Sequence, residues 1–131
     1  MKVRDFNSNE FLWGERKYKL LFYQVSHGEM ILRSDKDDIA QSHTIDIYFG
    51  DVKYMEIPSE LNGIRFRRAN ENDIRYLKSK KLSDITEDEV VVIISNGTEY
   101  FVVAALISIL ENDLSYMELP IHCFLHSVKE N

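Results

Sequence analysis

Cysteine is almost absent from this sequence, and its scarcity limits how the chain can be held together. The 131 residues include one cysteine, Cys123, so no disulfide can form within the chain. A chain without disulfides suits a reducing compartment. The N-terminal residues also lack the apolar core of a secretory signal. We therefore expect a cytoplasmic protein.

Long apolar runs and glycine motifs are missing as well. The apolar run at residues 100–110 is shorter than the roughly 20 residues that cross a bilayer, so no membrane contact is expected. None of the five glycines stands in a G-x-x-x-x-G-K or G-x-G-x-x-G pattern, and no G-x-S-x-G elbow marks a nucleophilic serine. We predict a binding protein without a cofactor rather than an enzyme.

What the sequence does contain is a strong β-hairpin signal around Asn96-Gly97. Two runs rich in β-branched residues flank this dipeptide within residues 89–110. Both central residues of a type I′ turn need positive φ, which Asn tolerates and Gly adopts freely. Neither run alternates between apolar and polar residues, so we expect both faces of these strands to be covered.

The other elements are also mostly strands, and one domain over residues 1–131 is expected. Strands are predicted at residues 17–25, 30–33, 43–48, 53–57 and 64–68, with a last edge strand at 116–119 and 121–125, split by Pro120. Residues 49–52 form a turn or a bulge, so 43–57 is one kinked strand or two short ones. Alternation in 43–48 predicts a half-buried strand. The one helix is predicted at residues 71–81, with Asn70 as its N-cap.

These elements define the expected fold class. We predict an α+β domain, mainly antiparallel β, with about six to eight strands arranged as a sandwich or half-barrel and one short helix.

Charge is distributed unevenly along the chain, although the total is −6. Residues 64–81 hold seven Lys and Arg against two Asp and Glu, a net +5. Residues 82–131 hold one against nine, a net −8. The contrast is expected to be used either in internal ion pairs or in steering a charged partner.

Two acidic loops and one basic segment are the candidate binding residues. Partner binding is predicted for the acidic loops Asp35, Asp37, Asp38 and Asp84, Glu87, Asp88. The alternative is a small anion- or nucleotide-binding module in the basic segment from Arg65 to Lys81, with Arg65, Arg67, Lys78 and Lys81 forming the pocket. Duplex nucleic acid is an unlikely ligand in that case, because the acidic flanks would repel a long polyanion.

Metal binding is not predicted. Asp35 begins a calcium-loop-like run, but the sixth and twelfth positions are Ala40 and Asp46 instead of the required Gly and Glu. His122, Cys123 and His126 could share a metal, but a zinc site needs three or four ligands and no local motif supplies the rest. Whether this cluster binds metal stays open at this point.

Part of the chain resembles a known class of proteins. The resemblance spans residues 23–66, through SHGEMILRS (26–34), TIDIYFGDVKYMEIP (44–58) and LNGI (61–64). These stretches are similar to small bacterial immunity proteins of polymorphic toxin and contact-dependent inhibition systems. The resemblance implies a cytoplasmic antitoxin that occludes one toxin domain, which we expect to be basic. Buried aromatics such as Trp13 or Tyr54 would anchor the contact.

Overall fold

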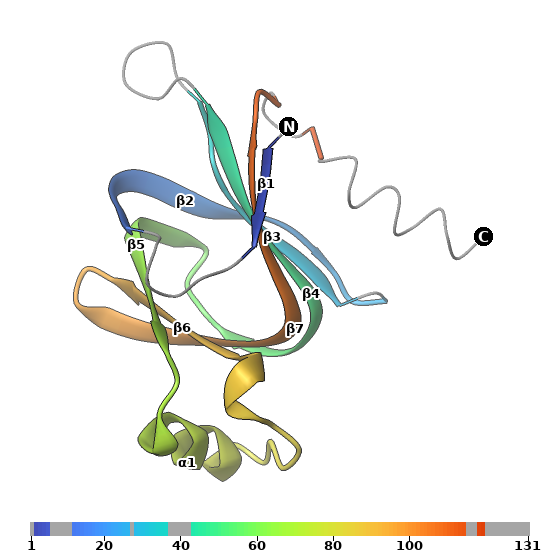
Figure 1. The fold of residues 1–131 in the computed structure, drawn as a ribbon, viewed down its shortest axis with the longest axis vertical. Helices are drawn as coiled ribbons and strands as arrows, with labels where there is room; N and C mark the ends of the chain where they lie inside the picture. The colour runs from blue at the N-terminus through green and yellow to red at the C-terminus, as the bar shows by residue number, and fades with distance from the viewer. Residues whose placement is uncertain (1, 6–11, 27, 37–42, 115–117, 120–131) are drawn as a thin grey trace.

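The computed structural model describes residues 2–5, 12–26, 28–36, 43–114 and 118–119. These residues form seven strands, one α-helix and one short 3₁₀ helix, η1 (Figure 1). The elements are β1 (Lys2–Asp5), β2 (Leu12–Gln24), β3 (Glu29–Ser34), β4 (Thr44–Glu56), β5 (Glu60–Arg68), α1 (Glu71–Ser79), η1 (Glu87–Glu89), β6 (Val90–Ser95) and β7 (Thr98–Asn112). The predicted strand-rich architecture with one α-helix is confirmed for this part of the chain.

Six of the strands close into a barrel, with every pairing antiparallel. The order is β7-β4-β3-β2-β5-β6, and β6 pairs with β7 to complete the ring. β7 makes this closure possible because one of its edges pairs with β4 along almost its full length, while the other pairs with β6 and then with β1. The closed barrel corrects the expectation of a sandwich or half-barrel.

The segment between residues 43 and 57 is one continuous strand, β4, with a local irregularity. Asp51 has a φ of 53°, and the register with β7 shifts between Val52 and Tyr54. The turn between β2 and β3 packs against this point, where the amide of Val52 donates to the carbonyl of Gly28 at 2.8 Å. A Cβ on Gly28 would lie 3.0 Å from that amide nitrogen, so the contact requires glycine.

The predicted turn and helix start are both confirmed. Asn96 and Gly97 have φ values of 51° and 76°, and Ser95 pairs with Thr98 across the turn, as a type I′ hairpin requires. At the start of α1, the Asn70 side chain accepts from the Asp73 amide at 3.1 Å, and the Asp73 carboxylate accepts from the Asn70 amide at 2.8 Å. The helix ends at Ser79, two residues earlier than predicted.

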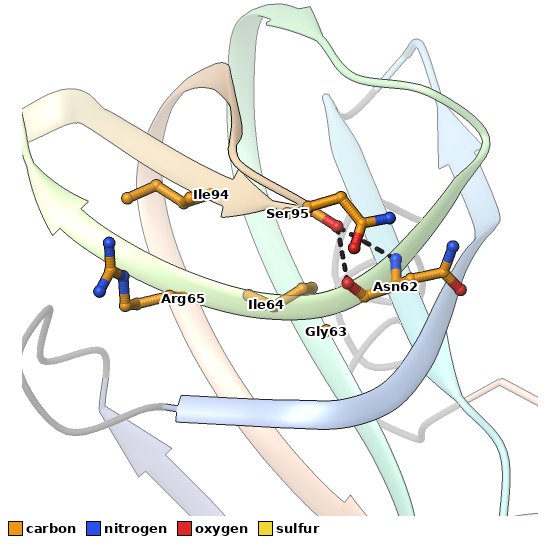
Figure 2. Close-up of a pocket in the computed structure, with 7 residues that line it drawn as sticks. Asn62, Gly63, Ile64, Arg65, Ile94 and Ser95 are labelled. Atoms are coloured by element: carbon orange, nitrogen blue, oxygen red, sulfur yellow. Dashed lines mark hydrogen bonds between the residues drawn. The ribbon is translucent and has the colours of Figure 1, made fainter.

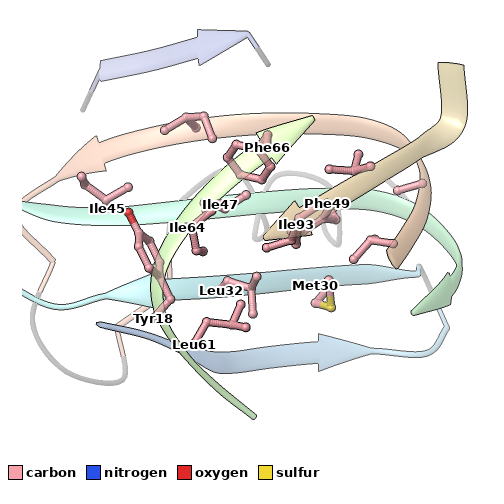
Figure 3. Packing of buried hydrophobic residues seen from close by; sticks show 14 residues of the cluster. Tyr18, Met30, Leu32, Ile45, Ile47, Phe49, Leu61, Ile64, Phe66 and Ile93 are labelled. Atoms are coloured by element: carbon pink, nitrogen blue, oxygen red, sulfur yellow. The ribbon is translucent and has the colours of Figure 1, made fainter. Parts of the chain in front are cut away.

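The barrel interior is filled by apolar side chains from all six barrel strands (Figure 3). Ten of them are labelled in the figure: Tyr18, Met30, Leu32, Ile45, Ile47, Phe49, Leu61, Ile64, Phe66 and Ile93. A second cluster joins Leu77 of α1 to Val90 and Val92 of β6 and to Phe101 and Val103 of β7. The helix therefore covers the outer face of the β6–β7 hairpin. Both faces are covered, as predicted, at residues 90–93 and 101–104, whereas Leu106 further along β7 is 60% exposed.

The expectation that residues 43–48 form a half-buried strand is wrong. Asp46 and Tyr48 are 0% and 2% exposed, although they belong to the face opposite Ile45 and Ile47. This face can be buried because most of its polar groups bond to one another and because Tyr48 also packs with Ile31 and Leu110. The Arg33 guanidinium donates to both carboxylate oxygens of Asp46, at 2.6 and 2.9 Å.

Two further hydrogen bonds complete this outer-face network. Asn112 of β7 donates to Asp46 at 3.0 Å, and the Tyr48 hydroxyl donates to Glu29 at 2.7 Å. Three neighbouring strands, β3, β4 and β7, are thus joined by side chains as well as by their backbones.

The predicted last edge strand lies largely outside the described residues, as do His122, Cys123 and His126. Glu118 and Leu119 are described and belong to no strand. Within the described part of the chain, no helix combines the length and apolarity that crossing a bilayer requires.

Candidate functional site

The loop between α1 and β6 carries one of the two predicted acidic clusters. Asp84, Glu87 and Asp88 are all exposed, and the last two lie in η1. The turn is held in place by Glu89, whose amide donates to the Thr86 carbonyl at 3.1 Å and whose carboxylate accepts from the Thr86 amide at 3.3 Å. The carboxylates therefore stand on an ordered turn.

A lysine near the end of β4, Lys53, binds the last carboxylate of this turn. The Lys53 ammonium is 2.6 Å from the Glu89 carboxylate. This hydrogen bond raises the pKa of Lys53, and the negative charges of Glu89, Asp51 and Asp84 raise it further, against a lowering by burial. The same bond lowers the pKa of Glu89. Asp51 and Asp84 are therefore close enough to act on Lys53.

Together these residues form what we call the acidic surface: Asp51, Asp84, Glu87, Asp88 and Glu89, with Lys53 bound to Glu89. It carries five carboxylates against one ammonium group, a net charge of −4. Asp51 was not among the predicted binding residues, because its place beside this loop depends on a tertiary contact, the ion pair between Lys53 of β4 and Glu89 of η1.

The second predicted acidic loop lies at the opposite end of β4. Asp35 is exposed, and the next residue, Lys36, donates its amide to Thr44 at the start of the strand, at 3.2 Å. Lys53 follows nine positions later, up to roughly 30 Å along an extended strand. The start of β4 and η1 lie at opposite ends of the molecule in Figure 1. Asp37 and Asp38 lie outside the described residues.

Arg67, from the predicted anion pocket, forms ion pairs within the protein. Its guanidinium donates to both oxygens of Asp73, at 2.7 and 3.0 Å, and to Glu99 at 2.8 Å. These bonds, with Asp73 contributing most, raise the pKa of Arg67 well above its ordinary value, and they lower that of Asp73. Arg67 thus ties the start of α1 to β5 and β7, and its charge is neutralised internally.

Arg65, two residues earlier on β5, borders a hollow (Figure 2). The hollow has a volume of about 270 Å³ and is lined by Asn62, Gly63, Ile64, Arg65, Ile94, Ser95 and Asn96. Of the four predicted cations, all of them within the described residues, Arg65 alone lines it. Lys78 is exposed on α1, and Lys81 is exposed just beyond the end of the helix.

The hollow forms where the pairing between β5 and β6 stops being regular. The ladder includes Arg65 opposite Ile94, and Gly63 has a φ of 70°. The Ser95 hydroxyl then takes the place of a backbone partner: it accepts from the Asn62 amide and donates to the Asn62 carbonyl, both at 3.0 Å (Figure 2). Sequence reasoning missed this site because nothing local shows that residues 62–65 face residues 94–96.

Of the two aromatic residues predicted to anchor a partner, the structure describes the side chain of Tyr54 only. Tyr54 is half-buried near the end of β4, where its hydroxyl donates to Glu56. Trp13 belongs to β2, and its side chain lies outside the described part of the structure.

Comparison with known proteins does not assign this chain to a family. No protein-family model, no curated protein and no solved structure matches the chain. Among the described residues, no group of three or more His, Cys, Asp or Glu side chains is placed to hold a metal ion.

Proposed function

We propose that this protein binds a basic protein domain through the acidic surface and occludes it, as an immunity protein occludes its toxin. The observation that carries the proposal is the concentration of five carboxylates on the loop before β6 and the neighbouring end of β4, three of which (Asp51, Asp84 and Glu89) act on Lys53. The resemblance of residues 23–66 to immunity proteins supports the same function, and the basic toxin domain is then the expected partner.

The acidic surface is a better candidate than the Asp35 end for two reasons. It has the larger number of described carboxylates. In addition, no described residue forms an ion pair with Asp84, Glu87 or Asp88, so these groups are available to a partner. Arg67 shows the opposite case, because its charge is already satisfied by Asp73 and Glu99.

The mechanism would be electrostatic capture followed by steric occlusion. A surface with a net charge of −4 attracts a basic cleft from a distance, which raises association rates by about 10- to 1000-fold and depends on ionic strength. After contact, the barrel itself blocks access to the partner's cleft. Exposed carboxylates contribute to the rate of association more than to the final affinity.

The test is charge reversal with a matched control at the other end of β4. If the neighbouring gene encodes the toxin domain, as expected for an immunity protein, Asp84→Lys combined with Asp88→Lys should slow association with that domain by roughly tenfold and flatten its salt dependence. Asp35→Lys combined with Asp113→Lys changes the net charge equally, at the end of β4 that holds Thr44, and should leave most of the rate intact.

Stopped-flow fluorescence at low and physiological salt measures both variants. If the two pairs slow association equally, net charge alone matters and the acidic surface is not the interface. If the neighbouring gene's product does not bind the wild-type protein, the proposed function fails.

A further inference from the structure

We propose that the hollow between β5 and β6 is a binding site for a small organic anion, whose carboxylate or phosphate is held by Arg65. This site lies outside the acidic surface, and the inference does not depend on the proposed function. It rests on the contrast between two neighbouring arginines and on the groups that line the hollow.

Arg65 and Arg67 stand two residues apart on β5 and therefore on the same face of the strand. Arg67 donates to Asp73 and Glu99. Arg65 is exposed, and no described residue accepts a hydrogen bond from its guanidinium. A guanidinium presents donors in a planar fork that matches a carboxylate or phosphate. Arg65 therefore offers this fork at the edge of a concave surface.

The rest of the lining complements an anion with a compact apolar part. Asn62 and Asn96 also line the hollow, are exposed and carry amide donors. Gly63, which also lines the hollow, has no side chain to fill it. Ile94 is partly exposed and supplies an apolar wall beside Arg65, which it faces across the ladder.

Size and charge narrow the class of ligand. A volume of about 270 Å³ admits a compact metabolite, somewhat below the usual range for drug-sized ligands. Glu99 pairs in register with Ile94 and so lies beside the hollow, but its carboxylate is engaged by Arg67 at 2.8 Å. Arg65 is the only charged residue among those that line the hollow, and a single cation suits a small anion and not a polyanionic strand.

The experiment is an NMR titration of the full chain with two probes, inorganic phosphate and benzoate. Saturable shifts are expected at the amides of Gly63, Arg65 and Asn96. Benzoate is expected to bind more tightly than phosphate, because its ring can contact Ile94. Arg65→Gln should raise the Kd of both probes at least tenfold.

Two matched variants make the outcome decisive. Arg68→Gln removes another exposed arginine of β5 that does not line the hollow, and it should leave both Kd values unchanged. Ile94→Thr should weaken benzoate and spare phosphate. The inference is overturned if neither probe gives saturable shifts at these amides, or if Arg65→Gln and Arg68→Gln weaken binding equally. A dispersed wild-type-like spectrum shows that each variant is folded.

Discussion

Replacing Asp46 by Asn tests the buried network on the outer face of the barrel. The substitution keeps the size of the side chain and removes its charge. Asp46 accepts two hydrogen bonds from Arg33 and one from Asn112. The side chains of Arg33 and Asp46 are 1% and 0% exposed. In the variant, a buried guanidinium loses the carboxylate that balances its charge.

The expected cost is large for a single substitution. Removing one partner of a buried ion pair destabilises a protein by about 3–5 kcal/mol, whereas the total stability of a domain is about 5–15 kcal/mol. With a urea m-value of about 2 kcal/mol/M, the unfolding midpoint should fall by roughly 2 M. The exposed pair of Lys17 and Glu60, at 3.1 Å, is the control. Glu60→Gln should cost less than about 1 kcal/mol.

A double-mutant cycle separates the ion pair from the general effect of each change. Arg33→Met leaves the Asp46 charge buried, and Asp46→Asn leaves the Arg33 charge buried. The double variant buries neither charge, so it should be destabilised by about 2–3 kcal/mol less than the sum of the two single variants. Urea unfolding followed by circular dichroism gives all four values. The reasoning is refuted if Asp46→Asn costs no more than Glu60→Gln, because water would then have to reach the pair.

Two further predictions concern pH and backbone conformation. A hydrogen bond to Glu56, with burial as a smaller cause, raises the pKa of Tyr54 to about 12. The folded state therefore favours the neutral phenol of Tyr54. The resulting stabilisation should be complete below about pH 10 and should be lost as the pH rises from about 10 to 12. Tyr54→Phe should remove that part of the alkaline dependence of the urea midpoint, and an unchanged profile would count against it. Gly97→Ala should cost about 1 kcal/mol, since its φ is 76° and nothing lies within 4 Å of the added Cβ. Gly28→Ala should cost more by about 1–3 kcal/mol, because its Cβ would also press on the Val52 amide at 3.0 Å; equal urea midpoints for the two alanine variants would contradict this.

The features that could be predicted from the sequence are those decided by a few neighbouring residues. Asn96-Gly97 specifies its own turn because the required φ values belong to those two residues. Asn70 and Asp73 cap the helix three residues apart, so the helix start was also visible. Residues 43–57 were predicted as one kinked strand or two, and the kink at Asp51 lies inside the segment expected to contain it.

The features that could not be predicted depend on residues far apart in the chain. The sequence pattern suggests that Thr44, Asp46 and Tyr48 form the solvent-facing side of a strand, but all three are buried. Each has a partner from another part of the chain: Leu114 for Thr44, Arg33 and Asn112 for Asp46, and Glu29 for Tyr48. A pattern of alternating polarity cannot report such partners.

The candidate sites show the same limit. Asp84, Glu87 and Asp88 could be singled out by charge, but the contribution of Asp51 depends on tertiary packing. For the hollow, Arg65 was recognised as a candidate cation. Its neighbours Ile94 and Asn96 became apparent only from the β5–β6 register.

The pairing of β4 with β7 has a consequence for folding during synthesis of the chain. Thr44 pairs with Asn112, so the β4–β7 pairing cannot form until a segment that is synthesised much later has left the ribosome. Until residues 98–112 emerge, β4 and β6 remain open edges, which other chains could recruit. The addition of β7 closes the ring, so a chain whose synthesis stops before residue 98 would expose two unpaired strand edges and tend to aggregate.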